Sequence, residues 1–198
     1  SDTRPWFFLQ TAHTTYGMRV METGHLEHLY YGERITVDAQ DSASCVPLII
    51  QRAFTPGNTC TYDREHPQIS MEDICLEVGT LGKGDIREPF LEVRFADGSV
   101  TSDFTFDSYK VITLKEREQC LQDSGLPHSY SETETDSAEC LQIVLQDVTN
   151  RLELQLFYTV FEECDVITRS ARLINHSDAT VTLDRCLSAQ LDLTEDYS

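Results

Sequence analysis

Hydrophobic and polar positions alternate along most of this chain, and glycine, proline, asparagine or aspartate interrupts the alternation at short intervals. Leu152, Leu154 and Leu156, for example, alternate with Glu153 and Gln155. Successive side chains of a β-strand point to opposite faces of the sheet, so this pattern predicts a strand with one buried face. On the same grounds we expect strands at residues 6–12, 16–21, 26–31, 90–95, 100–106, 109–114, 141–148, 166–175, 181–186 and 187–193.

Helical periodicity is nearly absent. Only residues 70–78 suggest one short helical turn, with Ser70 able to cap it and Asp73 placed three positions later. The pair Asp97-Gly98 predicts a tight hairpin between the strands on either side of it, because glycine accepts a positive φ at little cost. Many short strands joined by turns predict an all-β fold, a large antiparallel β-sandwich with few or no helices, and we expect residues 1–198 to form one such domain.

The alternation lapses between residues 37 and 89, where prolines and glycines accumulate. Apolar residues such as Ile49, Ile50, Phe54 and Ile74 give this segment something to bury, which argues against disorder. Long loops inside compact domains are usually found where a ligand binds or a neighbour packs. We therefore expect any binding function of the domain to lie in this loop.

The charge and the cysteines narrow the classes of partner and compartment. With 34 acidic and 15 basic side chains, the formal net charge is -19. This field repels phosphate backbones and anionic lipid surfaces, so neither nucleic acid nor a membrane is an expected partner. The sequence contains no apolar run that could span a bilayer and no signal peptide. Its seven cysteines form no CxxC pair, which argues against a zinc site or a disulfide framework and favours a reducing, cytoplasmic location.

Candidate chemical groups are numerous but lack a supporting pattern. His25 and His28 lie three positions apart on a predicted strand, so one should face inward and the other the surface, which disfavours a shared metal ion. Carboxylate pairs such as Glu162 and Glu163 are expected from the abundance of acidic residues and fit solvated surface groups. We expect no metal, no cofactor and no catalytic residue in this chain.

Four short phrases stand in order along the sequence: GHLEHLYYG at residues 24–32, GKGDIREP at 82–89, GLP at 125–127 and DVITRS at 165–170. In this order and at these distances they resemble the amino-terminal domain of glycoside hydrolase family 36, the bacterial and fungal α-galactosidases. The likeness extends over nearly the whole chain, from about Phe7 to Tyr197.

The resemblance implies a modular enzyme: an amino-terminal β-supersandwich, a central (β/α)₈ barrel with the active site and a carboxy-terminal β-sandwich. The implied reaction is retaining hydrolysis of terminal α-1,6-linked galactose from melibiose, raffinose or stachyose, which needs two carboxyl groups roughly 5 Å apart. In the family both are barrel aspartates, with the nucleophile in a Lys-Trp-Asp phrase, and the only tryptophan here is Trp6. This chain would be the first module, inactive alone, with α-galactoside oligosaccharides and further copies in a homotetramer as implied partners.

In tetrameric relatives, a loop of this domain helps to wall the sugar pocket of a neighbouring subunit. The matching positions, in the phrase PLIIQRAF at residues 47–54, are Gln51 and Arg52, and many relatives carry a carboxylate where this chain has Gln51. Arginine offers sugar hydroxyls five donors in a rigid fork, so Arg52 is the preferred contact, and pairing with a carboxylate of its own domain is the alternative. Asp85 and Arg87 are the second pair of candidate substrate-binding residues, with pinning of their own loop as the alternative.

Three functions of different classes stay open. The first is a non-catalytic scaffold and subunit interface in a retaining α-galactosidase, which the resemblance favours. The second is an independent carbohydrate-binding module, which would bind galactose or melibiose without the rest of the enzyme. The third is a pure oligomerisation domain with no part in any sugar pocket.

Overall fold

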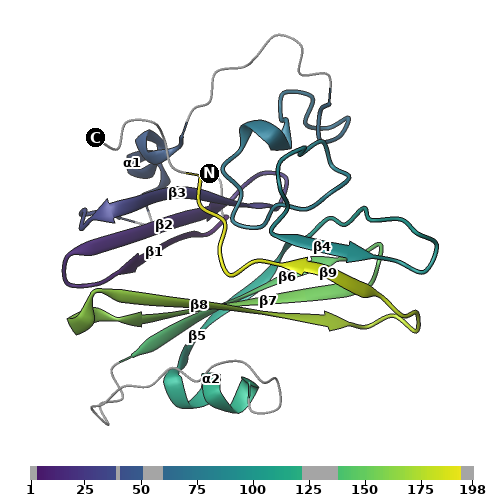
Figure 1. Ribbon diagram of the computed structural model, residues 1–198. Coiled ribbons are helices and arrows are strands. Elements are labelled where there is room, and N and C mark those ends of the chain that lie inside the picture. Colours follow the sequence, from purple (N-terminus) through teal and green to yellow (C-terminus); the bar gives the residue numbers. More distant parts are fainter. Residues whose placement is uncertain (1–3, 39–40, 51–59, 122–137, 193–198) are drawn as a thin grey trace.

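The computed structural model describes residues 4–38, 41–50, 60–121 and 138–192 (Figure 1). Within these residues, strands and irregular segments dominate, and helix is scarce, so the predicted all-β fold is confirmed. Helical structure consists of α1 (Ser42–Cys45), α2 (Leu114–Leu121) and the 3-10 turns η1 (Val46–Leu48), η2 (Met71–Asp73) and η3 (Glu162–Cys164). The strands are β1 (Trp6–Gln10), β2 (Thr14–Val20), β3 (Leu26–Glu33), β4 (Leu91–Arg94), β5 (Thr105–Thr113), β6 (Glu139–Asp147), β7 (Leu152–Phe161), β8 (Val166–Asn175) and β9 (Thr182–Cys186).

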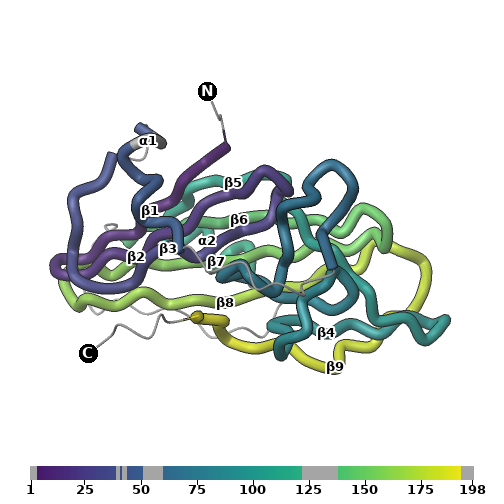
Figure 2. The backbone as a smooth tube through the Cα atoms, turned by 90° about the horizontal axis from the view of Figure 1, so that it is seen from above, coloured from purple at the N-terminus to yellow at the C-terminus, as the bar shows by residue number. Residues whose placement is uncertain are grey.

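The strands form two layers of antiparallel sheet. One layer is the four-stranded sheet β5-β6-β7-β8, and the other consists of the three-stranded sheet β1-β2-β3 and the two-stranded sheet β4-β9. The two smaller sheets lie side by side over the larger one (Figure 1 and Figure 2). This is the face-to-face sandwich that the sequence predicts, with one of its layers divided.

The main hydrophobic cluster fills the space between the layers. Leu152, Leu154 and Leu156 of β7 are buried in it, and Leu154 lies opposite Leu145 of β6 in the strand register. The polar residues between these leucines sit on the other face and are only half-buried. Each fully buried leucine contributes about 1.5–3 kcal/mol of transfer free energy, so the period-two pattern supplies most of the stabilisation of this sheet.

The predicted hairpin at Asp97-Gly98 is wrong. The turn itself forms, since Gly98 has a φ of 85° and its N–H donates to the carbonyl of Phe95 over 2.9 Å. However, β4 pairs with β9 from the far end of the chain, and residues 100–104 form no strand as they cross to β5 in the opposite layer. A turn signal is local, whereas the choice of partner strand depends on contacts between distant residues.

The helix α2 was missed by the sequence analysis, although its starting signal is present. The Thr113 side chain accepts the N–H of Glu116 over 3.3 Å, and the Glu116 carboxylate accepts the N–H of Thr113 over 2.8 Å. This reciprocal pair is a capping box, which satisfies N–H groups that the first helical turn leaves unpaired. At residues 70–78, where a helical turn was predicted, only the short turn η2 forms.

The prediction that one of His25 and His28 faces the surface is also wrong, because both are buried. His25 precedes β3 and therefore does not follow the alternation of that strand. Its ring nitrogens lie 2.9 Å from the Thr23 hydroxyl and 2.9 Å from the Asp103 carboxylate. These polar partners within the domain offset the cost of burying His25.

The irregular segment between β3 and β4 is fastened to the sandwich through Asp103. The hydroxyl of Tyr62 and the ammonium group of Lys83, both from this segment, lie 3.0 Å from one Asp103 oxygen. Burial alone would raise the pKa of Asp103, but His25 and Lys83 outweigh burial and lower that pKa to about 2. Asp103 therefore stays charged and holds the segment at neutral pH.

Candidate functional site

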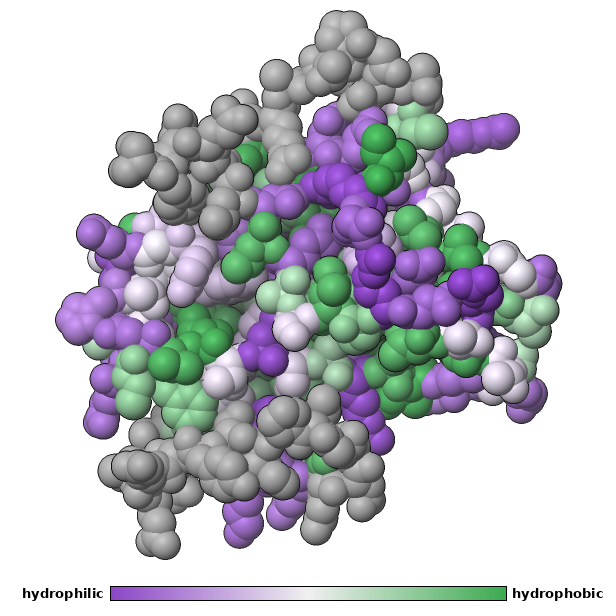
Figure 3. Space-filling model, viewed as in Figure 1, coloured by the Kyte–Doolittle hydropathy of each residue, from purple (hydrophilic) through white to green (hydrophobic). Residues whose placement is uncertain are grey.

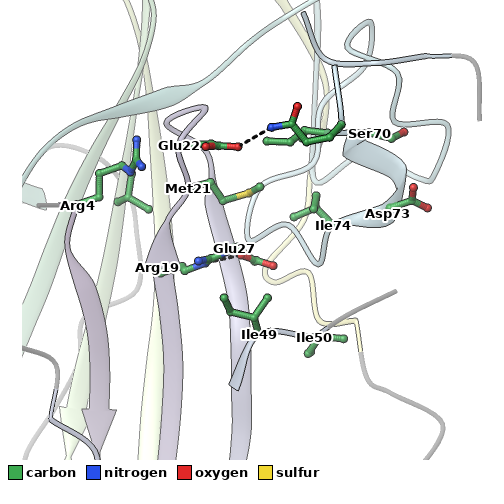
Figure 4. A pocket seen from close by; sticks show the side chains of 13 residues that line it. Arg4, Arg19, Met21, Glu22, Glu27, Ile49, Ile50, Ser70, Asp73 and Ile74 are labelled. Carbon is green, nitrogen blue, oxygen red and sulfur yellow. Dashed lines mark hydrogen bonds and ion pairs between the residues drawn. The ribbon is translucent and has the colours of Figure 1, made fainter. Parts of the chain in front are cut away.

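A cleft of about 510 Å³ opens beside β2 and β3, close to where the chain leaves towards Gln51 (Figure 4). One side is formed by the ends of β2 and β3 and the turn between them, and the other by the segment around η2. Ile49 and Ile50, which follow η1, complete the wall. Its remaining lining residues are Arg4, Arg19, Val20, Met21, Glu22, Glu27, Gln68, Ile69, Ser70, Asp73 and Ile74.

An ion pair between neighbouring strands lines this cleft. The Arg19 Nε of β2 donates to the Glu27 carboxylate of β3 over 2.6 Å, and the guanidinium also lies 5.2 Å from the centre of the Trp6 ring. Burial raises the pKa of Glu27 despite the opposing charge of Arg19. The pair therefore offers a fixed cation and a desolvated carboxyl group within one cleft.

The opposite side of the cleft contains Ser70, whose side-chain hydroxyl is buried. The Ser70 Oγ is buried and has no hydrogen-bond partner among the described residues. At the rim, the Gln68 amide donates to the Glu22 carboxylate over 3.3 Å, as the dashed line in Figure 4 shows. Leaving a buried hydroxyl unpaired costs about 1–3 kcal/mol, so Ser70 marks a point where an incoming acceptor or donor would be favoured.

The preferred sugar contacts of the sequence analysis, Gln51 and Arg52, lie outside the described residues. Ile50, which lines the cleft, is the last described residue before them. Gln51 and Arg52 therefore follow directly, in the sequence, a residue that lines the cleft.

A second polar cluster, which sequence reasoning missed, is centred on the fully buried carboxylate of Glu77. It accepts hydrogen bonds from the hydroxyls of Tyr16 over 2.5 Å and Tyr158 over 2.8 Å. His28 Nδ1 lies 3.1 Å from it and Arg169 Nη1 3.3 Å. Tyr16 and His28 come from the β1-β2-β3 sheet and Tyr158 and Arg169 from the opposite layer, so Glu77 joins the two layers.

The charge state of this cluster follows from its contacts. Burial alone would raise the pKa of Glu77, but the hydrogen bond with His28 and the charge of Arg169 lower it below the usual value. Burial and the Glu77 charge raise the pKa of Tyr158. Glu77 is thus an ionised structural group surrounded by neutral phenols. The sequence signals for it were indirect: His28 belongs to the GHLEHLYYG phrase and Arg169 to the DVITRS phrase.

The glycosyl hydrolase family 36 N-terminal domain matches residues 24–198 of this sequence. The chain belongs to this family. It is 36% identical over 191 residues to the bifunctional α-galactosidase/sucrose kinase AgaSK of Mediterraneibacter gnavus and 34% identical over 192 residues to the α-galactosidase AgaA of Geobacillus stearothermophilus, over 96% of this chain in both cases. Its likeness covers only 19% and 25% of those two relatives, so this family 36 domain spans about a fifth to a quarter of their length.

Solved structures agree with the family assignment. The α-galactosidase of Lactobacillus brevis superposes on the domain with a TM-score of 0.76 at 33% identity, covering 97% of this chain and 24% of that one. A variant of AgaA from Geobacillus stearothermophilus was solved in complex with stachyose, and it superposes with a TM-score of 0.75 at 32% identity, covering 93% of this chain and 24% of that one. Another AgaA variant was solved with raffinose.

In this family 36 domain, Asp85 and Arg87 contact each other and hold two distant segments. Arg87 donates to both Asp85 oxygens over 2.8 and 2.9 Å, to Asp192 over 2.5 Å, and to the carbonyls of Met71 and Ile74 over 3.0 and 2.7 Å. Each guanidinium nitrogen therefore already has an acceptor. These contacts favour the pinning alternative for the Asp85 and Arg87 pair.

The cysteines, the potential metal ligands and the helices of the family 36 domain bear on the expectations from the sequence. All seven cysteines lie in described positions and are free thiols. No cluster of three or more His, Cys, Asp or Glu side chains that could hold a metal occurs in the part of the chain that the structure describes. Of the helices in that same part, none is long and apolar enough to cross a membrane.

Proposed function

We propose that this chain is the non-catalytic amino-terminal domain of a retaining α-galactosidase, which acts on terminal α-1,6-linked galactose in melibiose, raffinose and stachyose. The observation that carries the proposal is its family 36 likeness along 96% of its length to proteins named α-galactosidases, of which it matches about a quarter or less. The domain would serve as a scaffold and subunit interface in a cytoplasmic homotetramer.

Three carboxylates beside the cleft or in the core support a non-catalytic role, because each is already paired within the domain. Retaining hydrolysis needs a nucleophile and an acid roughly 5 Å apart on either side of the scissile bond, both reachable by the sugar. Glu27 is paired with Arg19, Asp103 with Lys83 and His25, and Glu77 is enclosed by four side chains. These groups stabilise the domain and are not free to attack a substrate.

The proposal is tested by assaying melibiose and raffinose hydrolysis with the complete polypeptide and with residues 1–198 alone. We expect turnover by the complete polypeptide, with retention at the anomeric carbon, and none by the isolated domain. Galactoside cleavage by the isolated domain would contradict the non-catalytic role. A complete polypeptide inactive on every α-galactoside would contradict the assignment of activity.

We further propose that Gln51 and Arg52 form part of the wall of a neighbouring subunit's sugar pocket, next to the cleft at Ile50. Changing Arg52 to alanine in the complete enzyme should lower kcat/KM for raffinose by about 10- to 100-fold, because a charged hydrogen bond contributes about 1.5–3 kcal/mol. The tetramer, measured by light scattering, should stay intact. Arg64→Ala, at an exposed arginine of the same irregular segment, is the matched control and should leave kcat/KM unchanged.

Unchanged kcat/KM in the Arg52 variant would instead favour a pure oligomerisation domain. An independent carbohydrate-binding module is the other candidate, and the 510 Å³ cleft with its charged pair and unpaired hydroxyl is the feature that favours it. Titration calorimetry of galactose and melibiose against residues 1–198 distinguishes this module from a scaffold, because only a carbohydrate-binding module would bind the sugars without the rest of the enzyme.

For Asp85 and Arg87 we propose the pinning role, because their side chains are already engaged within the domain.

A further inference from the structure

The segment that follows β9, residues 187–192, runs as an extended strap over the rest of the domain. No sheet includes it, although a strand was predicted here. The strap is nevertheless pinned at three places. Leu187 donates its N–H to the carbonyl of Phe90 over 2.9 Å, and Gly79 donates its N–H to the side chain of Gln190 over 2.8 Å. Arg87 donates to Asp192 over 2.5 Å at the end of the strap.

The strap keeps apolar side chains in contact with solvent. Leu187 is 40% exposed and Leu191 42% exposed, and Tyr31 of β3 is 42% exposed nearby across a small cleft. Hydrophobic side chains, drawn in green, lie in the middle of the face that Figure 3 shows, where Figure 1 places the strap. The strap is held in place by hydrogen bonds, while its leucines stay partly exposed. Exposed apolar side chains on an ordered backbone are typical of a contact surface.

The cleft beneath the strap has about 170 Å³ of space and mostly apolar walls. Tyr16 and Tyr31 contribute to one side, Ile167 of β8 to another, and Ala189 and Leu191 of the strap close it. Arg169 also lines this cleft; its side chain is only 9% exposed, and its Nε has no hydrogen-bond partner among the described residues. The cleft therefore offers room for an apolar side chain between the strap and the sandwich.

We propose that this strap face, defined by Tyr31, Ile167, Leu187, Ala189 and Leu191, is the docking surface for the remaining part of the same polypeptide. The proposed partner is an apolar segment that places a side chain in the cleft. The inference rests on the proposed function in one respect: the docked part is the portion of the α-galactosidase that this chain does not cover.

Length and connection favour this partner over a second copy. The solved relatives extend well beyond the part that resembles this chain, which is 24% of the Lactobacillus brevis enzyme. The last described residue, Asp192, directly follows Leu191 of this face in the chain. A tethered partner has a high effective concentration, so a modest apolar surface suffices for docking.

The test is hydroxyl-radical footprinting of the complete polypeptide, read by mass spectrometry at single residues. Val148, in the turn after β6 and 77% exposed, is the internal reference. If the face is covered, Leu187, Leu191 and Tyr31 should be oxidised about tenfold more slowly than their exposure in the domain predicts relative to Val148, because the core of an interface excludes water. Oxidation at the rates that their exposure predicts would overturn the proposal.

Two further measurements identify the docked partner and distinguish failure of the docking proposal from failure of the proposed enzyme function. Protection that disappears on dilution to monomers would identify a second copy as the occupant and overturn the proposal. Leu191→Asp in the complete polypeptide should restore oxidation of Tyr31, whereas the matched variant Val111→Asp, at a 59% exposed valine of β5, should not; equal behaviour of the two variants would count against docking. Footprinting does not depend on turnover, so an inactive protein with a protected strap face would contradict the proposed function alone.

Discussion

Replacing Glu77 with alanine is expected to lower the free energy of unfolding by about 3–5 kcal/mol, because removing one partner of a buried ion pair leaves the other charge uncompensated. Arg169, also buried, would keep its charge, and the hydroxyls of Tyr16 and Tyr158 would lose their acceptor. Urea denaturation followed by tryptophan fluorescence or circular dichroism measures this change. Glu163→Ala, at an exposed glutamate of η3, is the matched control and should change stability by less than about 0.5 kcal/mol.

The same network predicts how stability depends on pH. The folded-state pKa of Glu77 is below its usual value of 4.5, because His28 and Arg169 outweigh the effect of burial. The stabilisation from ionised Glu77 is therefore complete above pH 4.5 and is lost as the pH falls through the lower folded-state pKa. The stability difference between the wild type and Glu77→Gln should be constant near neutral pH and shrink below pH 4.5. A difference that grows on acidification would show that Glu77 is protonated in the folded protein.

Phe90→Ala should be nearly as damaging, with an expected loss of about 3–5 kcal/mol in unfolding free energy. The Phe90 ring is fully buried in the core between the layers, and its centroid lies 4.9 Å from the Arg169 guanidinium carbon. Truncation would leave a cavity and remove this cation–π contact. Denaturant titration checks the prediction, with Leu183→Ala of β9 as the control because that leucine is 49% exposed. Equal effects of the two variants would contradict the assignment of Phe90 to the core.

Local patterns in the sequence predicted the strands well, because a strand with one buried face must alternate. β7 lies where the alternation of Leu152, Leu154 and Leu156 indicated and β8 where a strand was predicted at residues 166–175, and the all-β sandwich follows from such segments. Local patterns did not predict which strands pair with each other. The Asp97-Gly98 turn is real, yet β4 pairs with β9, because the layer that buries Leu91 and Val93 is completed by residues from the other end of the chain.

The candidate site was predictable only in part. The segment between residues 37 and 89 does border a cleft of about 510 Å³, as its irregular composition suggested, but Gln51 and Arg52 fall outside the described residues. The Glu77 cluster could not be found from spacing, since Tyr16, His28, Glu77 and Tyr158 come from four separate segments. Each residue is ordinary alone, and only the packing of the two layers brings them together.

The pairing of β4 with β9 has a consequence for synthesis of the protein on the ribosome. β4 ends at Arg94, and among the described strands it pairs with β9, which begins at Thr182, so this half of the layer cannot close until residues 182–186 have emerged. Until then the edge of β4 that pairs with β9 is open to strands of other chains. Nascent chains arrested before β9 should consequently require chaperones, because the pairing of β4 depends on a distant part of the sequence.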